Sequence, residues 1–212
     1  MIQCELSKVR KQYGERVVLD GFDLRIEAGE MLALTGQSGS GKSTVLNMLG
    51  LLDAPDSGEV RILDRKAPKP RSRAANRMLR YHLGYLFQNF ALIDSATVAQ
   101  NLDIALTYAD KSVPKRDRFA EVLAHVGLPG AEDRRIYSLS GGEQQRVAVA
   151  RLMLKPCDIV LADEPTGSLD ADNRDIVLAL LREFSEAGKT VVIATHDDVV
   201  AEACSRTIGL TI

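Results

Sequence analysis

A glycine-rich segment in the first quarter of the chain constrains its fold more than any other feature. The segment consists of Gly36, Gln37, Ser38, Gly39, Ser40, Gly41, Lys42, Ser43 and Thr44. It matches the phosphate-binding loop G-x-x-x-x-G-K-[ST] at every required position. An apolar, strand-like stretch (residues 31–35) precedes it, and helix-like sequence (residues 44–49) follows. A buried strand, a glycine-rich loop and a helix in this order predict a phosphate site within an α/β fold.

Three kinds of group in this loop favour a nucleoside triphosphate as the ligand. The glycines let successive backbone N–H groups curl around phosphates, and the helix N-terminus adds a favourable dipole. Lys42 supplies a positive charge for the β- and γ-phosphates, and Ser43 offers a hydroxyl to Mg²⁺. The loop therefore predicts a site for ATP with Mg²⁺.

Two consecutive carboxylates end a second buried strand. The apolar run Ile159–Ala162 leads into Asp163 and Glu164. The strand can place Asp163 beside Mg²⁺ bound through Ser43, while Glu164 can face an attacking water. A carboxylate near a triphosphate should have a raised pKa, which suits a general base near neutral pH. Such a pair is a weak signal alone, but with the phosphate-binding loop it predicts a nucleoside triphosphatase.

A second candidate anion site lies in the segment Leu139–Gln145. Ser140 and two glycines precede residues 144–151, which have the pattern of a helix, so Ser140 would cap that helix. One nucleotide cannot occupy both sites of a single chain if they face different directions. Two chains arranged head to tail would sandwich ATP between the loop of one and the helix N-terminus of the other.

The rest of the sequence indicates one α/β domain with a helical lobe. Residues 2–9 and 17–26 alternate like an antiparallel pair, and residues 60–63 form another strand. Residues 89–137 are helical in character, and Ser112 can cap a helix that ends at Gly127. Two apolar strands (residues 158–162 and 190–194) flank an amphipathic helix, which predicts a parallel crossover.

Charge and hydropathy predict a cytosolic protein. The net charge of −2 gives no global attraction to nucleic acid or acidic lipid. No apolar run approaches the roughly 18 residues that cross a bilayer. The N-terminus lacks the features of a signal peptide. Cys4, Cys157 and Cys204 match no metal-binding spacing, so we expect reduced thiols.

Residues 139–145 resemble the signature motif of ABC ATPases, and the other motifs of that family occur in order across nearly all 212 residues. The resemblance implies a RecA-like core with an N-terminal antiparallel β-subdomain and an inserted α-helical subdomain at about residues 89–150. Residues 1–212 would form a single nucleotide-binding domain.

The same resemblance implies a role for each matching residue. It makes Tyr13 the aromatic that stacks on adenine, Gln88 the Q-loop glutamine and His196 the switch histidine. The implied catalytic residues are Lys42, Gln88, Glu164 and His196. The implied Mg²⁺ ligands are Ser43, Gln88 and Asp163. The nucleotide contacts outside the phosphate-binding loop would be Tyr13, Gln88, Ser140, Gly141, Gly142, Glu143 and the D-loop residue Asp170.

Within the family, residues 50–53, 55–60 and 163–170 resemble the macrolide-exporter and lipoprotein-release group. Residues 83–94 are similar to bacteriocin export ATPases of the lactococcin 972 type. Two departures are small: Gln37 stands where proline is common, and Ser168 where asparagine is common. The resemblance thus implies an ATPase that drives a separate membrane permease, in peptide, bacteriocin or drug export.

The implied partners are ATP, a second copy of the chain and an integral membrane permease that holds it on the inner face of the cell membrane. No nucleic acid is expected. One alternative is a mechanotransmission ATPase coupled to a non-transporting membrane partner. A soluble ABC ATPase acting on DNA or ribosomes is disfavoured, because the chain has no long coiled coil, zinc-binding cysteines or second cassette.

Two further segments have open interpretations. Phe90, Leu92 and Ile93 either pack a helical lobe onto the core or help to form a groove for a cytoplasmic helix of the permease. Residues 65–80 contain seven basic residues and no acidic one. They form either a solvated face or a contact with anionic headgroups or the permease.

Overall fold

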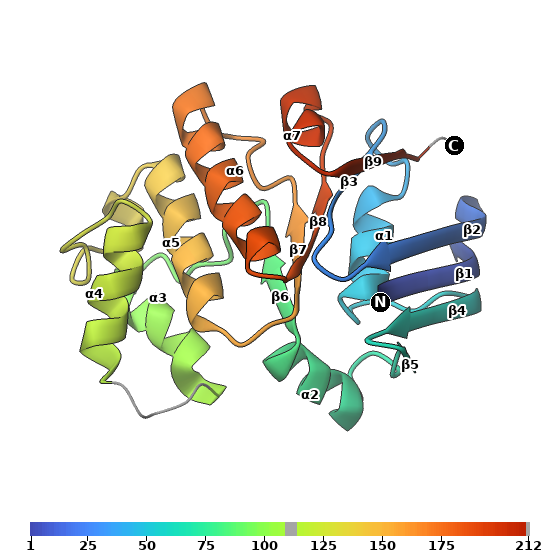
Figure 1. The fold of residues 1–212 in the computed structure, drawn as a ribbon, viewed down its shortest axis with the longest axis horizontal. Helices are drawn as coiled ribbons and strands as arrows, with labels where there is room; N and C mark the ends of the chain where they lie inside the picture. The colour runs from blue at the N-terminus through green and yellow to red at the C-terminus, as the bar shows by residue number, and fades with distance from the viewer. Residues whose placement is uncertain (109–113, 211–212) are drawn as a thin grey trace.

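The computed structural model describes residues 1–108 and 114–210 and contains two β-sheets (Figure 1). The antiparallel sheet consists of β1 (Ile2–Tyr13), β2 (Arg16–Glu27), β4 (Ser57–Ile62) and β5 (Arg65–Lys66), in the order β2-β1-β4-β5. The predicted antiparallel opening is confirmed. Its strands are longer than expected, because pairing continues to Tyr13 and Arg16 on either side of a two-residue turn.

The parallel sheet consists of β6 (Leu83–Leu86), β7 (Ile159–Asp163), β8 (Thr190–Ala194), β3 (Met31–Thr35) and β9 (Arg206–Gly209), in that order. Nearly every residue of β3, β7 and β8 is buried, as expected for strands that are covered on both faces. The predicted crossover is confirmed, since β7 and β8 pair in parallel and α6 (Ala171–Glu186) connects them.

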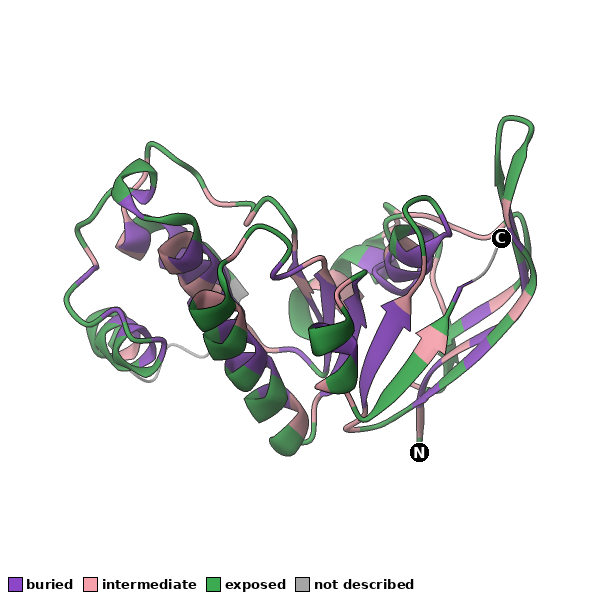
Figure 2. Cartoon of the chain, turned by 90° about the horizontal axis from the view of Figure 1, so that it is seen from above, coloured by how far each residue is buried: buried purple, intermediate pink, exposed green. Residues whose placement is uncertain are grey.

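Helices divide between the two faces of the parallel sheet. One face packs with α1 (Lys42–Leu49) and the antiparallel sheet in a shared apolar core. The other face packs with a second core that includes α3 (Val98–Ala105), α4 (Lys115–His125), α5 (Gly141–Leu154), α6 and α7 (Asp198–Glu202). Figure 2 shows the buried residues on the facing sides of these layers.

The remaining elements connect these layers. Two short 3₁₀ helices, η1 (Leu106–Tyr108) and η2 (Ile136–Ser138), lie among the helices, and α2 (Arg73–Tyr81) leads directly into β6. The predicted cap Ser112 lies outside the described residues; α4 follows Pro114. In the described ranges, no helix has the length and apolar character that a membrane span requires.

The parallel register positions the candidate site. Because β3, β6, β7 and β8 run in the same direction, the segments that follow them emerge at the same edge of the sheet. These segments carry the phosphate-binding loop, Gln88, Glu164 and His196.

Candidate functional site

The phosphate-binding loop is shaped so that its donors face a common space. Gly36 has a left-handed φ of 140°, and a Cβ there would lie 2.5 Å from the backbone oxygen of Leu210, so only glycine fits. Lys42 is buried, and its Nζ donates to the backbone oxygens of Gly36 (2.7 Å) and Gln37 (3.1 Å). Because α1 begins with no side-chain cap and no acid in its first turn, its N–H groups and Lys42 make this end positive.

One cleft of about 680 Å³ brings the predicted residues together from both sheets. Its lining consists of Tyr13, Arg16, Val18, Ser38, Gly39, Gly41, Lys42, Ser43, Thr44, Gln88, Asp163, Glu164 and His196. Arg16 and Val18 carried no signal in the sequence. They reach the cleft because the β1–β2 hairpin folds over the loop, where the Arg16 guanidinium donates to the backbone oxygen of Gly39 at 2.9 Å.

The residues expected to hold Mg²⁺ fit a hard cation. Ser43 Oγ donates to Asp163 Oδ1 at 3.1 Å, which places two oxygen donors side by side at the helix start. Burial raises the pKa of Asp163, and the Ser43 hydrogen bond opposes that rise. No group of three His, Cys, Asp or Glu side chains suited to a metal occurs within residues 1–108 and 114–210. Mg²⁺ held by Ser43 and Asp163 would take its other ligands from phosphate and water oxygens, as is usual for this ion.

Glu164 and His196 form a polar pair at the ends of two neighbouring strands. His196 Nδ1 lies 2.9 Å from Glu164 Oε1. Glu164 has a left-handed φ of 45°, a conformation that costs roughly 1–3 kcal/mol in a residue with a side chain. Its backbone N–H donates to the oxygen of Ala194 at 2.9 Å, which holds this conformation in place. The strained backbone and the His196 contact fix the carboxylate within the cleft.

Tyr13 is exposed at the end of β1, where two neighbours fix its ring. Its hydroxyl donates to Asp53 Oδ2 at 2.6 Å, and Lys11 Nζ lies 5.0 Å from the ring centroid. Lys11 also pairs with Asp53 at 2.8 Å. Partial desolvation is the main cause of the raised pKa of Tyr13, and the Asp53 hydrogen bond adds to it. Sequence analysis assigned no role to Lys11 or Asp53, although Asp53 lies in the segment 50–53 that resembles the macrolide-exporter and lipoprotein-release group.

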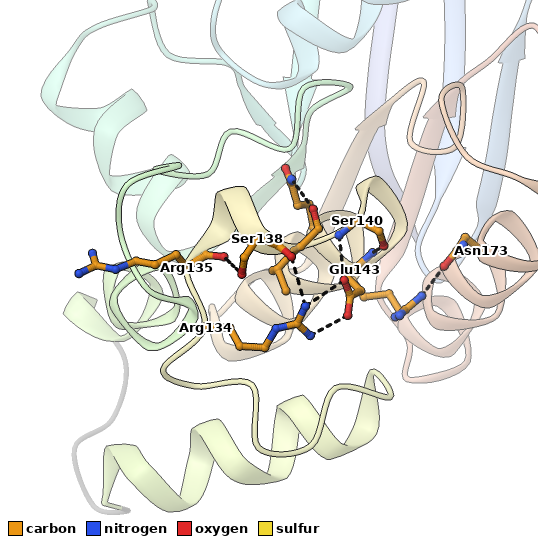
Figure 3. Close-up of polar contacts among 9 residues, drawn as sticks. Arg134, Arg135, Ser138, Ser140, Glu143 and Asn173 are labelled. Atoms are coloured by element: carbon orange, nitrogen blue, oxygen red, sulfur yellow. Dashed lines mark hydrogen bonds and ion pairs between the residues drawn. The ribbon is translucent and has the colours of Figure 1, made fainter.

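The second candidate anion site has the predicted serine cap. Ser140 Oγ accepts from the backbone N–H of Glu143 at 3.2 Å, and Glu143 Oε2 accepts from the N–H of Ser140 at 2.8 Å (Figure 3). Arg134 pairs with Glu143 at 2.7 Å, and this contact is the main cause of the lowered pKa of Glu143. The reciprocal bonds and the Arg134 pair together hold the start of α5 in one geometry.

Asn173, which sequence analysis missed, connects this helix start to the D-loop. Its side-chain amide donates to the Asp170 carboxylate at 2.9 Å. Its Oδ1 accepts a short hydrogen bond from Arg146 of α5 (Figure 3). A Cβ at Gly142 would lie 2.2 Å from Asn173 Oδ1. Only a glycine therefore allows the two segments this close approach.

The two groups of predicted residues lie apart within one chain. Gly36, Gln37 and Ser40 belong to the phosphate-binding loop although they do not line the 680 Å³ cleft. The members of the second group also lie outside its lining: Ser140, Gly141, Gly142, Glu143 and Asp170. The two groups of residues therefore do not line the same cleft in a single chain.

The segment of Phe90, Leu92 and Ile93 lies between the helical core and the surface. Phe90 and Leu92 pack partly buried against the helical core, and Ile93 is exposed. Phe90 and Ala91 have left-handed φ values, and Arg151 donates to both of their backbone oxygens, which turns this segment towards the helices.

A groove of about 560 Å³ lies between α2, β6, α3 and α5. Tyr85 and Phe87 stack in it with ring centroids 4.2 Å apart. The rest of its lining is Asn76, Leu79, Arg80, Ile104, Ala105, Ala148, Arg151, Leu152 and Lys155.

Comparison with known proteins places these features in a family context. Residues 19–167 match the family model described as ABC transporter. The macrolide export ATP-binding/permease protein MacB of Rhodopseudomonas palustris is 42% identical over 211 residues, which is 97% of this chain. The chain spans about a third (32%) of the length of that relative. The expected closeness to lactococcin-type bacteriocin export ATPases stays a prediction.

Solved structures resemble the whole chain. The dimeric structure of MJ0796, a bacterial ABC transporter cassette, has a TM-score of 0.88 and 37% identity, covering 98% of this chain and 94% of that one. A second dimeric structure of MJ0796, in a post-hydrolysis state bound to ADP and Pi, also has a TM-score of 0.88, with 36% identity over 99% of this chain and 94% of that one.

Proposed function

This chain belongs to the ABC transporter family, and on that premise we propose that it binds and hydrolyses ATP to drive a membrane permease. The observation that carries the proposal is the single cleft in which Lys42, Ser43, Asp163 and Glu164 meet. A positive loop, two Mg²⁺ ligands and a fixed carboxylate are the groups that hydrolysis of a phosphoanhydride requires.

ATP would place its phosphates against the positive end of α1. Lys42 Nζ, which donates to two backbone oxygens of its own loop, would turn to the β- and γ-phosphate oxygens. Ser43 and Asp163 would hold Mg²⁺. The bound ion would neutralise part of the negative charge of the phosphates. Tyr13, oriented by Asp53 and Lys11, would stack on the adenine ring.

Glu164 would act as the general base on the attacking water. The water oxygen forms a bond to the γ-phosphorus, the bond to the β-phosphate oxygen breaks, and the proton passes to the Glu164 carboxylate. His196, 2.9 Å from that carboxylate, would orient it. Gln88 lines the same cleft, and we propose it as a contact to Mg²⁺ and the γ-phosphate. The products are ADP and phosphate.

The complete site would need two copies of the chain. The capped turn at Ser140–Gly142 lies outside the cleft of its own chain, so a second copy would bring that turn to the bound triphosphate. The similarity to dimeric MJ0796 supports this arrangement. We propose that residues 89–150 form an inserted helical lobe whose movement brings Ser140 to the partner's nucleotide.

The membrane partner would dock in the groove between α2, β6, α3 and α5. Phe87 lines this groove and its neighbour Gln88 lines the nucleotide cleft, so one short segment touches both. We propose a position at the inner face of the cell membrane beneath a permease, with a drug, peptide or bacteriocin as the exported substrate. The identity to MacB, a macrolide export protein, supports export.

Two variants test the proposed chemistry. Lys42→Ala should lose ATP binding, while Glu164→Gln should keep binding and lose about 10²–10⁴-fold in phosphate release. Binding is measured by titration calorimetry with Mg²⁺ and ATP, and Lys8→Ala, an exposed lysine outside the cleft, is the control. Hydrolysis by Glu164→Gln near the parent rate would show that another group is the base.

A further inference from the structure

The segment from Arg65 to Arg80 forms a strongly basic surface that the nucleotide chemistry does not use. We define the basic surface as Arg65, Lys66, Lys69, Arg71, Arg73, Arg77 and Arg80, all of which are exposed. The rest of the chain contains 20 basic and 29 acidic residues. The positive charge is therefore local, on a chain that is otherwise acidic.

Five residues of the basic surface have no acidic partner in the described parts of the chain. Lys66 lies 3.6 Å from Glu59, which also pairs with Arg61. In the described parts of the chain, no carboxylate comes within 4.0 Å of the side-chain nitrogens of Arg65, Lys69, Arg71, Arg73 or Arg77. These charges therefore attract anions from outside the molecule.

Part of the basic surface is concave. A pocket of about 350 Å³ lies between the edge strand β5 and α2. Arg65 and Lys66 come from the strand and Arg77 from the helix, and the other lining residues are Pro68, Ala74, Met78 and His82. Two of its lining residues pair with acids: His82 with Asp158 at 2.6 Å and Lys66 with Glu59 at 3.6 Å. Arg65 and Arg77 line this pocket from different elements. Arginine suits a phosphate, because a guanidinium can donate two parallel hydrogen bonds to its oxygens.

The position of α2 favours a membrane as the source of that phosphate. Because α2 leads into the first residue of β6, it lies at the opposite edge of the parallel sheet from the nucleotide residues (Figure 1). One side of α2 lines the pocket of the basic surface, and Asn76 and Leu79 on its other side line the groove proposed for the permease. The basic surface therefore adjoins the side on which a membrane partner would dock.

We infer that the basic surface binds the phosphate headgroups of anionic lipids, which would orient the ATPase against the bilayer beside its permease. The inference rests on the proposed function, which places the chain at a membrane. Tyr81 is the one large exposed hydrophobic residue of the described segment 65–81, so the surface has no apolar centre of the kind found in protein interfaces. Dispersed arginines on a strand edge and a helix suit a layer of headgroups.

Vesicle flotation of the purified chain tests this directly. The probes are vesicles of phosphatidylcholine alone and vesicles of phosphatidylcholine mixed with phosphatidylglycerol. The parent should float with the anionic vesicles only, and added salt should release it. The variant Arg65→Glu/Arg73→Glu/Arg77→Glu should lose at least about a hundredfold in vesicle partition, since losing each basic residue near an anionic surface costs roughly fivefold and the new glutamates add repulsion.

A matched control carries the same change in net charge elsewhere. Lys8→Glu/Arg10→Glu/Arg116→Glu reverses three exposed basic residues outside the basic surface, and it should keep a partition close to that of the parent. Equal partition of the two triple variants, flotation with neutral vesicles, or binding of DNA without binding of vesicles would overturn the inference. Binding of the detergent-solubilised permease through these arginines, with no vesicle binding, would overturn it in favour of a protein contact.

The result of the vesicle experiment does not depend on the proposed ATP hydrolysis. The three arginines lie outside the nucleotide cleft, so basal ATP hydrolysis of the basic-surface variant should equal that of the parent. A parent chain that binds anionic vesicles but does not hydrolyse ATP would refute the proposed function and leave the lipid surface supported.

Discussion

The close approach of Gly142 to Asn173 gives a quantitative prediction for the substitution Gly142→Ala. The added Cβ would lie 2.2 Å from Asn173 Oδ1 and 2.3 Å from its Cγ, distances at which one group must move. If Asn173 moves, it loses its hydrogen bonds to the Asp170 carboxylate and the Arg146 guanidinium. The neighbouring Gly141 is the matched control, because a Cβ there meets no atom within 4 Å.

The expected loss of stability follows from these contacts. Overpacking costs about 1–3 kcal/mol, and a hydrogen bond to a charged group contributes roughly 1.5–3 kcal/mol. Alanine offsets about 1 kcal/mol of this because it favours a helix over glycine. We expect Gly142→Ala to lower the free energy of unfolding by about 1.5–5 kcal/mol, at roughly 2–4 °C in Tm per kcal/mol for a chain of this size. Gly141→Ala should be neutral or slightly stabilising.

Urea and thermal unfolding of a double-mutant cycle measure the effect. In the Asn173→Ala background the obstructing amide is absent, so Gly142→Ala should cost at least about 1 kcal/mol less than in the parent. Additive effects of the two substitutions, or equal stability of Gly142→Ala and Gly141→Ala, would refute the close-contact reasoning.

Two more predictions concern the nucleotide and the second half-site. Tyr13→Ala should weaken ATP binding by roughly 5–150-fold, because base stacking contributes about 1–3 kcal/mol, while Tyr13→Phe should bind nearly as the parent does in calorimetry; equal affinities of all three would exclude stacking. Arg134→Leu should reduce stability at neutral pH by up to about 1 kcal/mol. Because Arg134 lowers the pKa of Glu143, the stability difference is fully present above the usual carboxylate pKa and should be lost as the pH falls through the lowered pKa of Glu143. If urea unfolding showed a stability difference between the parent and Arg134→Leu that did not change with pH, the Arg134–Glu143 pair would be contradicted.

The fold and the main cleft could be predicted because each feature has a short-range signal. Residues 36–44, the apolar run before Asp163 and the capped turn at Ser140 each combine a backbone requirement with a charge requirement in a few consecutive residues. Parallel pairing of β3, β7 and β8 then brings these segments to one edge of the sheet. Local sequence patterns and the rule that parallel strands end at one edge of the sheet were enough to predict the fold and the main cleft.

The supporting contacts could not be predicted because they join residues that are distant in sequence. Asp53 reaches Tyr13 across 40 residues, and Arg16 reaches Gly39 across 23. Asn173 approaches Gly142 only because α5 and α6 pack together. The turn at Phe90 is another contact between distant residues. Arg151, 61 residues away, donates to the Phe90 backbone oxygen and holds the turn there.

The central claim, that two copies enclose ATP between their half-sites, is tested most directly by the mass of the Glu164→Gln variant in solution. Light scattering coupled to size exclusion should show a monomer without nucleotide and a dimer with ATP and Mg²⁺, because turnover is blocked while both half-sites are intact. Lys42→Ala should remain a monomer in both conditions. A Glu164→Gln variant that binds ATP and still remains a monomer at high protein concentration would contradict the account.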